Sequence, residues 1–311
     1  MRQHFADQLI QRIRSLRHPL CVGLDPHLDR IPDLFRQGSM QASDPRTADA
    51  VQAFLGAVLE RIGSRVAVIK PQIAFFERLG WRGLKVLETV VAQARRQELL
   101  VLLDAKRGDI GSTAKGYAEA YLGGEAAIEC DAMTLNPYLG CDTLAPFLST
   151  ARDHDRGLFV LVKTSNPGSG DFQDRRLEAG PRVEAGLRVF EAVADALAEP
   201  SQAMRGSLTG WSSLGVVVGA TYPGQSEQIR ERLPHALFLV PGYGAQGGSA
   251  EAALRGFVPG DSGMLEGGIV NSSRGILFPA GAATDHAPSW EGAIDQALER
   301  SIDELSQAAG R

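Results

Sequence analysis

Two carboxylates and an ammonium group follow the apolar run of residues 99–103 within a six-residue stretch: Asp104, Asp109 and Lys106. Residues two apart on a β-strand point to the same side, so Asp104 and Lys106 are expected to project together. Asp109 lies beyond the predicted strand end and is expected to belong to a different wall of the site. Because such a trio would be costly in an apolar core, it is either a solvated loop with a surface ion pair or a cluster that carries chemistry.

Lysine is rare in this chain, and its positions are informative. Only five of the 32 basic residues are lysines, and three of the five, Lys70, Lys106 and Lys163, end apolar strand-like runs. Lysine differs from arginine in being a compact charge that can give up a proton. We interpret this placement as a sign that some of these positions need a proton donor.

Two further charges are expected near the Asp104–Lys106 pair. Asp25 and Lys70 end the first two predicted strands. Each alone would more often be a cap or a structural ion pair, but together with that pair they form an alternating charge cluster that could hold sugar hydroxyls. The acidic and histidine residues at 153–155 lie in a polar loop without a partner cluster, and we interpret them as solvated rather than as a metal site.

The elements that must position these residues are short apolar runs that alternate with helical patterns. The eight runs span residues 20–24, 66–70, 99–103, 132–135, 158–162, 214–218, 236–240 and 268–271. Apolar residues at helical spacing predict helices that include 5–16, 81–96, 183–198 and 290–305. Eight strands alternating with helices favour a parallel sheet closed into a (β/α)8 TIM barrel over an open Rossmann sheet. No linker divides the chain, so we expect a single domain over residues 1–311.

The composition excludes several classes of protein. A net charge of -5 gives no reason to expect nucleic acid or an anionic membrane as a partner. The three cysteines, Cys21, Cys130 and Cys141, show no CxxC spacing and fit reduced thiols better than a disulfide framework or a zinc site. No apolar run approaches the roughly 18 residues of a membrane span, and the N-terminus does not have the pattern of a signal peptide. We therefore expect a cytoplasmic protein.

A glycine-rich loop follows the seventh predicted strand. Its sequence GYGAQG, residues 242–247, is a literal GxGxxG, which alone is a weak indication of a dinucleotide site. Such a motif should open the first βαβ unit, whereas six other strands precede the strand that leads into it here. The acidic residue that should follow the next strand is also missing, because Glu266 comes before residues 268–271. A dinucleotide site is therefore disfavoured.

A phosphate site explains the same loop better. In (β/α)8 barrels the loops after the seventh and eighth strands commonly hold a phosphate. The backbone N–H groups of Gly247 and Gly248, Gln246 as a donor and Arg274 as a charge would suit a phosphate monoester. The alternative is a glycine-rich turn beside a structural arginine.

The run DAKRGDIGSTA, residues 104–114, resembles the signature of the orotidine 5'-phosphate decarboxylase family. The resemblance extends over most of the chain, through VGLDP at Asp25, IKPQ at Lys70, TLNPYLG at Asn136, LVKTSNPGS at Ser165, PGYGAQGG at Gln246 and the Arg274 loop. The long loop after the first strand and the NPGSGDFQ stretch resemble the longer bacterial subgroup. The DxKxxD spacing alone is shared with related sugar-phosphate decarboxylases and synthases, whereas the whole set of motifs is far more specific.

The resemblance implies a fold and a reaction. The protein would be a homodimeric (β/α)8 barrel that uses no metal and no organic cofactor. It would convert orotidine 5'-monophosphate to uridine 5'-monophosphate and CO2 in pyrimidine biosynthesis. Lys106 would protonate C6 of the pyrimidine as CO2 leaves, and Asp104 would lie near the substrate carboxylate.

The resemblance also implies roles for the remaining candidates. Asp109 and Thr113 would reach into the partner subunit's site and bind ribose hydroxyls. Asp25 and Lys70 would contact the ribose and complete the charged network, Ser165 would bind the pyrimidine, and Gln246 with Arg274 would hold the phosphate. Lys163 receives no role from the resemblance.

Two other functions remain open at this point. The first is a metal-dependent sugar-phosphate decarboxylase or aldol-type synthase, which would be expected to carry a carboxylate ligand where this chain has Lys70. The second is a non-catalytic phosphate-binding barrel, which explains the glycine-rich loop but leaves the charged residues after the third strand without a function.

Overall fold

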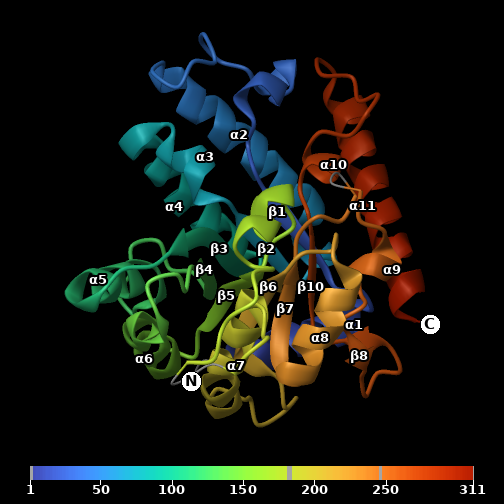
Figure 1. The fold of residues 1–311 in the computed structure, drawn as a ribbon. Helices are drawn as coiled ribbons and strands as arrows, with labels where there is room; N and C mark the ends of the chain where they lie inside the picture. Colours follow the sequence, from blue (N-terminus) through green and yellow to red (C-terminus); the bar gives the residue numbers. More distant parts are fainter. Residues whose placement is uncertain (1–2, 181–183, 245–246, 311) are drawn as a thin grey trace.

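A computed structural model describes residues 3–180, 184–244 and 247–310. Eight parallel strands close into a barrel in the order β1-β10-β7-β6-β5-β4-β3-β2, which confirms the predicted (β/α)8 architecture (Figure 1). The barrel strands are β1 (Leu20–Leu24), β2 (Val68–Pro71), β3 (Leu100–Arg107), β4 (Ala132–Leu135), β5 (Gly157–Lys163), β6 (Ser212–Val218), β7 (Ala236–Val240) and β10 (Gly268–Ser272).

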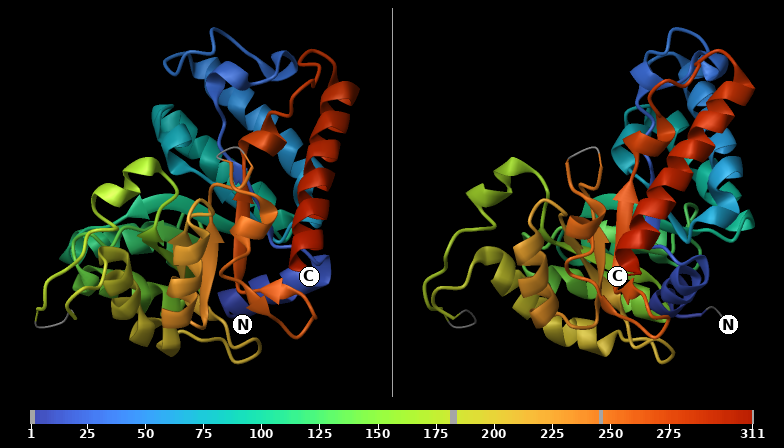
Figure 2. Two further views of the ribbon diagram at one scale, coloured as in Figure 1. Left: turned by 45° about the vertical axis from the view of Figure 1, so that its right-hand side comes forward. Right: turned by 90° about the vertical axis from the view of Figure 1, so that its right-hand side faces the viewer.

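Helices surround the barrel and close one of its ends. The longer outer helices are α2 (Pro45–Ile62), α4 (Gly80–Arg96), α5 (Gly111–Leu122), α6 (Ala145–Asp153), α7 (Val189–Ala203), α8 (Pro223–Arg232) and α11 (Ala287–Ala309). Helix α1 (Phe5–Leu16) lies at the lower end of the barrel in Figure 2, away from the end toward which the strand arrows point. Its Phe5 ring packs edge-on against Phe159 of β5, with the ring centroids 6.1 Å apart. The opposite, C-terminal end of the strands is left for the loops that could form a site.

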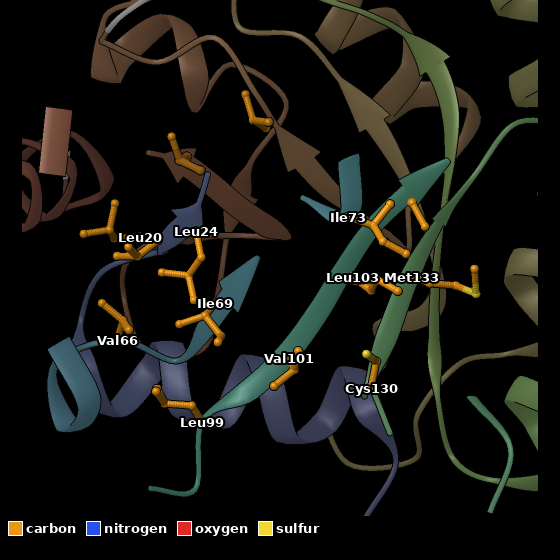
Figure 3. Packing of buried hydrophobic residues seen from close by; sticks show 14 of the residues in the cluster. Leu20, Leu24, Val66, Ile69, Ile73, Leu99, Val101, Leu103, Cys130 and Met133 are labelled. Carbon is orange, nitrogen blue, oxygen red and sulfur yellow. The ribbon is translucent and has the colours of Figure 1, made fainter. Parts of the chain in front are cut away.

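Alternation along the strands produces two apolar layers. In β3, Val101 and Leu103 belong to the layer between the barrel and its helices, while Leu100 and Leu102 point inward and share a cluster with α1. Figure 3 shows part of the outer layer, including Val101 and Leu103 beside residues of the neighbouring strands. Asp104 is the next residue of β3 that points inward after Leu100 and Leu102. The same period of two that fills the barrel thus places a carboxylate at its mouth.

Several details differ from the elements expected from the sequence. The predicted helix over 183–198 is instead α7, which begins at Val189, because Gly186 has a φ of +88° and Glu191 accepts a hydrogen bond from the Arg188 N–H at 2.7 Å. Strand β3 continues beyond residue 103 to Arg107. The short helices α3 (Ile73–Glu77), α9 (Ala250–Ala253) and α10 (Arg274–Leu277) and the hairpin of β8 (Val258–Pro259) with β9 (Leu265–Glu266) were not expected.

Within the described ranges, no helix is both long enough and apolar enough to cross a membrane.

Candidate active site

A cavity of about 430 Å³ opens at the C-terminal end of the barrel strands. Charged and polar side chains from six strands or their following loops line it, together with a few apolar ones. The lining residues are Asp25, Lys70, Gln72, Asp104, Lys106, Thr134, Leu161, Thr164, Ser165, Asn166, Val217, Leu239, Pro241 and Asn271. The structure therefore brings together Asp25, Lys70, Asp104, Lys106 and Ser165 from the residues singled out in the sequence.

The carboxylate of Asp104 lies between two ammonium groups. Lys70 Nζ donates to Asp104 Oδ2 at 2.9 Å, and Lys106 Nζ donates to Asp104 Oδ1 at 2.6 Å. Lys70 and Asp104 are buried, whereas the Lys106 side chain is 44% exposed. One carboxylate thus fixes two lysines, of which only Lys106 is open to the solvent side of the cavity.

Lys70, Asp104 and Lys106 form a row of alternating charges, and these charges keep the buried Lys70 and Asp104 ionised although burial favours their neutral forms. Burial favours the neutral form of Asp104, but Lys70 and Lys106 outweigh it and hold the pKa of this carboxyl well below its ordinary value of 3.8. Burial also disfavours the Lys70 ammonium, but Asp104 and Asp25 outweigh it and raise the pKa of Lys70 above its ordinary value of 10.5. Asp104 and Lys70 are therefore both ionised at neutral pH.

Asp25 extends the charged row at the end of β1. Its Oδ1 atom is buried and makes no hydrogen bond within the described residues. A buried carboxylate oxygen without a partner is unusual because the lost hydration is not replaced. Since Asp25 lines the cavity, the oxygen is an acceptor available to a hydroxyl of a bound molecule.

The loop after β5 forms another wall, and neighbouring segments hold it in place. Gln173 accepts from the Thr164 N–H at 2.9 Å and donates to the Thr164 hydroxyl at 2.8 Å. The Ser165 carbonyl accepts from the Thr221 hydroxyl at 3.2 Å. Two consecutive cavity residues, Thr164 and Ser165, are therefore fixed by contacts to residues outside the cavity lining.

Lys163 lies behind this wall rather than in the cavity lining. Its fully buried ammonium donates to Asp174 at 2.9 Å and lies 4.4 Å from the centroid of the Tyr222 ring. Asp174 also accepts from Gln225 Nε2 of α8 at 3.0 Å. Lys163, which received no role from the resemblance, thus connects the end of β5 to the insertion that follows it through its ion pair with Asp174.

The glycine-rich loop after β7 is closed on itself. The N–H of Gly247 donates to the Gly244 carbonyl at 2.8 Å, and the N–H of Gly248 donates to the Gly242 carbonyl at 3.1 Å. Both N–H groups therefore have acceptors within the loop in this structure, and their binding of a phosphate stays a prediction. A Cβ at Gly248 would lie 2.7 Å from the Gly242 carbonyl oxygen, so this close approach requires glycine.

The other two residues expected to hold a phosphate are Arg274 and Gln246. Arg274 begins α10 beyond the end of β10 and is exposed, and its guanidinium has no hydrogen bond or ion pair within residues 3–180, 184–244 and 247–310. It does not belong to the described lining of the cavity. Gln246 lies outside the described residues.

Asp109 and Thr113 also lie apart from the cavity of their own chain. Asp109 is half-buried, and its Oδ1 accepts from the Ile110 N–H at 2.8 Å. Thr113 is exposed on α5, and neither residue lines the described cavity. Ile110 and Tyr138, which follow β3 and β4, are exposed apolar side chains at 63% and 87%.

Reasoning from charged and glycine-rich motifs missed several neutral lining residues. Thr134 and Asn271 occupy inward positions near the ends of β4 and β10, and Leu161, Val217 and Leu239 line the same cavity from β5, β6 and β7. Strand alternation could have found them, because each lies an even number of residues above an inward-facing neighbour. For metals, the described part of the chain holds no group of three or more His, Cys, Asp or Glu residues that could bind an ion.

Comparisons with known proteins agree with this geometry. The sequence profile of the orotidine 5'-phosphate decarboxylase / HUMPS family matches residues 18–284. The chain is 38% identical over 310 residues to an orotidine 5'-phosphate decarboxylase from Rhodopirellula baltica, covering 97% of this chain and 98% of the relative. It is 42% identical over 285 residues to that of Roseiflexus castenholzii, covering 90% and 93%. The structure of Leishmania donovani OMP decarboxylase matches with a TM-score of 0.73 at 32% identity, covering 99% of this chain and 100% of that one. The chain therefore belongs to the orotidine 5'-phosphate decarboxylase / HUMPS family and is a decarboxylase, a carbon–carbon lyase.

Proposed function

We propose that this protein converts orotidine 5'-monophosphate to uridine 5'-monophosphate and CO2 in de novo pyrimidine biosynthesis, without a cofactor. The observation that carries the proposal is the row Lys70–Asp104–Lys106 at the wall of the cavity. The bond between C6 and the carboxylate carbon breaks, and its electron pair stays on C6. That pair takes a proton from Lys106 Nζ, and the resulting amine regains a proton from water.

A fixed ammonium suits this reaction for an electrostatic reason. Loss of CO2 leaves negative charge on C6 in a ring that has no adjacent electron sink. An ammonium already held beside that carbon stabilises the charge without reorganisation as it develops. Asp104 orients Lys106 through the 2.6 Å contact and is itself fixed by the buried Lys70. The same ammonium then acts as the general acid.

The remaining cavity residues would bind the rest of the nucleotide. Asp25 Oδ1, which has no hydrogen-bond partner among the described residues, would accept from a ribose hydroxyl, next to the Lys70 ammonium. Ser165, held in the wall after β5, would bind the pyrimidine. Arg274, exposed and without an ion partner in the described segments, would bind the phosphate together with Gln246. The phosphate lies far from the bond that breaks, so its binding energy can order the loops around the reacting ring.

A second subunit would complete each site. Asp109 and Thr113 do not line the cavity of their own chain, although they belong to the motif that contains Lys106. The nearby side chains of Ile110 and Tyr138 are apolar and exposed, as expected for a surface that a second copy of the chain covers. We therefore propose a homodimer in which Asp109 and Thr113 bind ribose hydroxyls in the partner's site.

The test is an assay of the purified protein with orotidine 5'-monophosphate in the presence of excess EDTA. Substrate loss is followed by ultraviolet absorbance, and uridine 5'-monophosphate is identified by chromatography. We expect full activity with EDTA, because Lys106 supplies the positive charge at C6. Absence of product would contradict the proposal. Inactivation by EDTA with recovery on adding Mg²⁺ would assign the chain to the metal-dependent alternative instead.

A further inference from the structure

We propose that Thr134 is a positioning residue for the decarboxylation, because its hydroxyl holds both the Asp104 carboxylate and the backbone that carries Lys106. The inference rests on the proposed function and goes beyond it by assigning a role to a neutral side chain of β4. Thr134 is fully buried and lines the cavity. The three hydrogen bonds of its hydroxyl all involve residues 104–106.

The need for this residue arises from a bulge in β3. Leu103 pairs with Met133 and Arg107 pairs with Leu135, so the three residues 104–106 of β3 lie opposite the single residue Thr134 of β4. One residue of β4 has a single backbone carbonyl, so it cannot accept from the N–H groups of three residues of β3. The Thr134 hydroxyl oxygen takes the place of the missing carbonyl and accepts from the N–H groups of Ala105 at 2.9 Å and Lys106 at 2.8 Å.

The bulge also places Lys106 in an unfavourable backbone conformation. Its φ is +47°, in the left-handed region that residues with a Cβ seldom adopt. Such a conformation persists only where the surroundings fix it, and it is often found where a side chain must be aimed at a reacting group. The hydrogen bond from the Lys106 N–H to Thr134 is a contact that fixes it directly.

The third bond of the hydroxyl reaches the charged row. A threonine hydroxyl has one hydrogen to donate and two lone pairs with which to accept. Because two N–H groups occupy the lone pairs, the hydrogen is directed at Asp104 Oδ1, 2.9 Å away. The same oxygen accepts from Lys106 Nζ at 2.6 Å. When Lys106 gives its proton to C6, Thr134 therefore keeps this carboxylate oxygen bonded and in place.

The experiment compares Thr134→Val with Thr134→Ser. Valine has nearly the same shape but no hydroxyl, whereas serine keeps the hydroxyl and loses only the methyl group. In Thr134→Val we expect kcat to fall about 10- to 100-fold, the size of losing a hydrogen bond to a charged group in the transition state. KM and the calorimetric Kd for uridine 5'-monophosphate should change less than about threefold, because the groups that bind ribose and phosphate are untouched. Thr134→Ser should keep at least about a third of the wild-type kcat.

A second measurement does not depend on activity. Hydrogen–deuterium exchange of a peptide containing residues 104–107 should be faster in Thr134→Val, because two N–H groups lose their acceptor, and unchanged in Thr134→Ser. The matched control is Thr47→Val, which removes another fully buried hydroxyl, one that donates to the Gln41 carbonyl at 2.8 Å. This control should leave both kcat and the exchange of residues 104–107 at wild-type values.

Three results would overturn the inference. They are a wild-type kcat in Thr134→Val, a Thr134→Ser variant as slow as Thr134→Val, and an unchanged exchange rate at 104–107 in Thr134→Val. The second of these would assign the effect to packing of the methyl group. If the wild type itself does not decarboxylate orotidine 5'-monophosphate, the proposed function fails. In that case the exchange of residues 104–107 still tests, without any activity, whether the Thr134 hydroxyl fixes the bulge.

Discussion

The ammonium nitrogen of Lys106 lies 2.6 Å from Oδ1 of Asp104, yet the two side chains differ in exposure, at 44% for the lysine and 11% for the aspartate. The other oxygen of Asp104 is bound by the buried Lys70 at 2.9 Å. Asp104 is therefore the fixed member of the pair, and Lys106 is the member that can approach a molecule in the cavity. A proton donor needs this combination of a fixed orientation and access to its acceptor.

The stability contributed by Asp104 should depend on pH. A carboxylate with a lowered folded-state pKa stabilises the fold fully above its ordinary pKa of 3.8, and this stabilisation is lost as the pH falls toward the folded pKa. The raised pKa of Lys70 acts in the opposite direction, so its contribution is complete below 10.5 and lost only as the pH rises through the folded pKa. Between about pH 5 and 9 both contributions are complete.

We therefore expect Asp104→Asn to lower the free energy of unfolding by about 3 kcal/mol near pH 7, because it leaves the buried Lys70 without its main partner. The difference from wild type should shrink below about pH 4. Urea unfolding at several pH values measures it, with Asp109→Asn as a control that removes a half-buried carboxylate without an ion pair in the described structure. A difference that does not vary between pH 3 and 7 would contradict the account.

Arg274→Ala should mainly weaken substrate binding. A charge-assisted contact to phosphate acts at a distance from C6, so we expect KM for orotidine 5'-monophosphate to rise about 10- to 100-fold. Some loss of kcat is also expected if loop closure depends on the contact. Steady-state kinetics on the nucleotide and on orotidine, which lacks the phosphate, separate these effects. The variant should resemble wild type on orotidine, and an unchanged KM for the nucleotide would show that the phosphate binds elsewhere.

Two inactive variants should restore activity to each other if each site contains residues of two chains. In the proposed dimer, Lys106→Ala would remove the proton donor of a chain's own site, and Asp109→Ala would remove a ribose contact of the partner's site. A mixed dimer then has one site with both defects and one with neither. Random exchange makes half the dimers mixed, so about a quarter of all sites should be intact.

The measurement mixes the two variants under conditions in which labelled subunits are shown to exchange. Activity that stays at the level of the separate variants, despite exchange, would mean that Asp109 acts within its own subunit. Thr113→Ala provides a second test of the same geometry, because it should pair with Lys106→Ala in the same way.

The barrel could be predicted from the sequence because its strands are continuous apolar runs. The run at 236–240 coincides with β7, and that at 132–135 coincides with β4. The bulge at 104–106 could not be predicted in this way, because its cause is the register against β4, a contact between segments distant in the sequence. The start of α7 at Val189 was also missed, because an apolar periodic pattern does not show where a capping interaction forms.

The charged part of the site could be predicted because ionised residues at strand ends are conspicuous, whereas the contacts of a neutral residue such as Thr134 could not. Thr134 resembles any strand threonine until its hydroxyl is seen between Asp104 and the Lys106 N–H. The hydrogen bonds of the Gly247 and Gly248 N–H groups to carbonyls within the glycine-rich loop could not be predicted either, since only the folded loop shows them. Motif chemistry identifies candidates, and the three-dimensional contacts decide which groups remain available.

The central claim is that Lys106 protonates C6, and the comparison of Lys106→Ala with Lys115→Ala tests it most directly. Lys115 is an exposed lysine of α5 whose ammonium is paired with Glu119 at 3.5 Å, so its removal takes the same charge from a position outside the cavity. We expect Lys106→Ala to lower kcat for the loss of orotidine 5'-monophosphate absorbance by at least about 10³-fold, with the melting temperature retained. Lys115→Ala should turn over as the wild type does. Wild-type turnover in a folded Lys106→Ala protein would contradict the account.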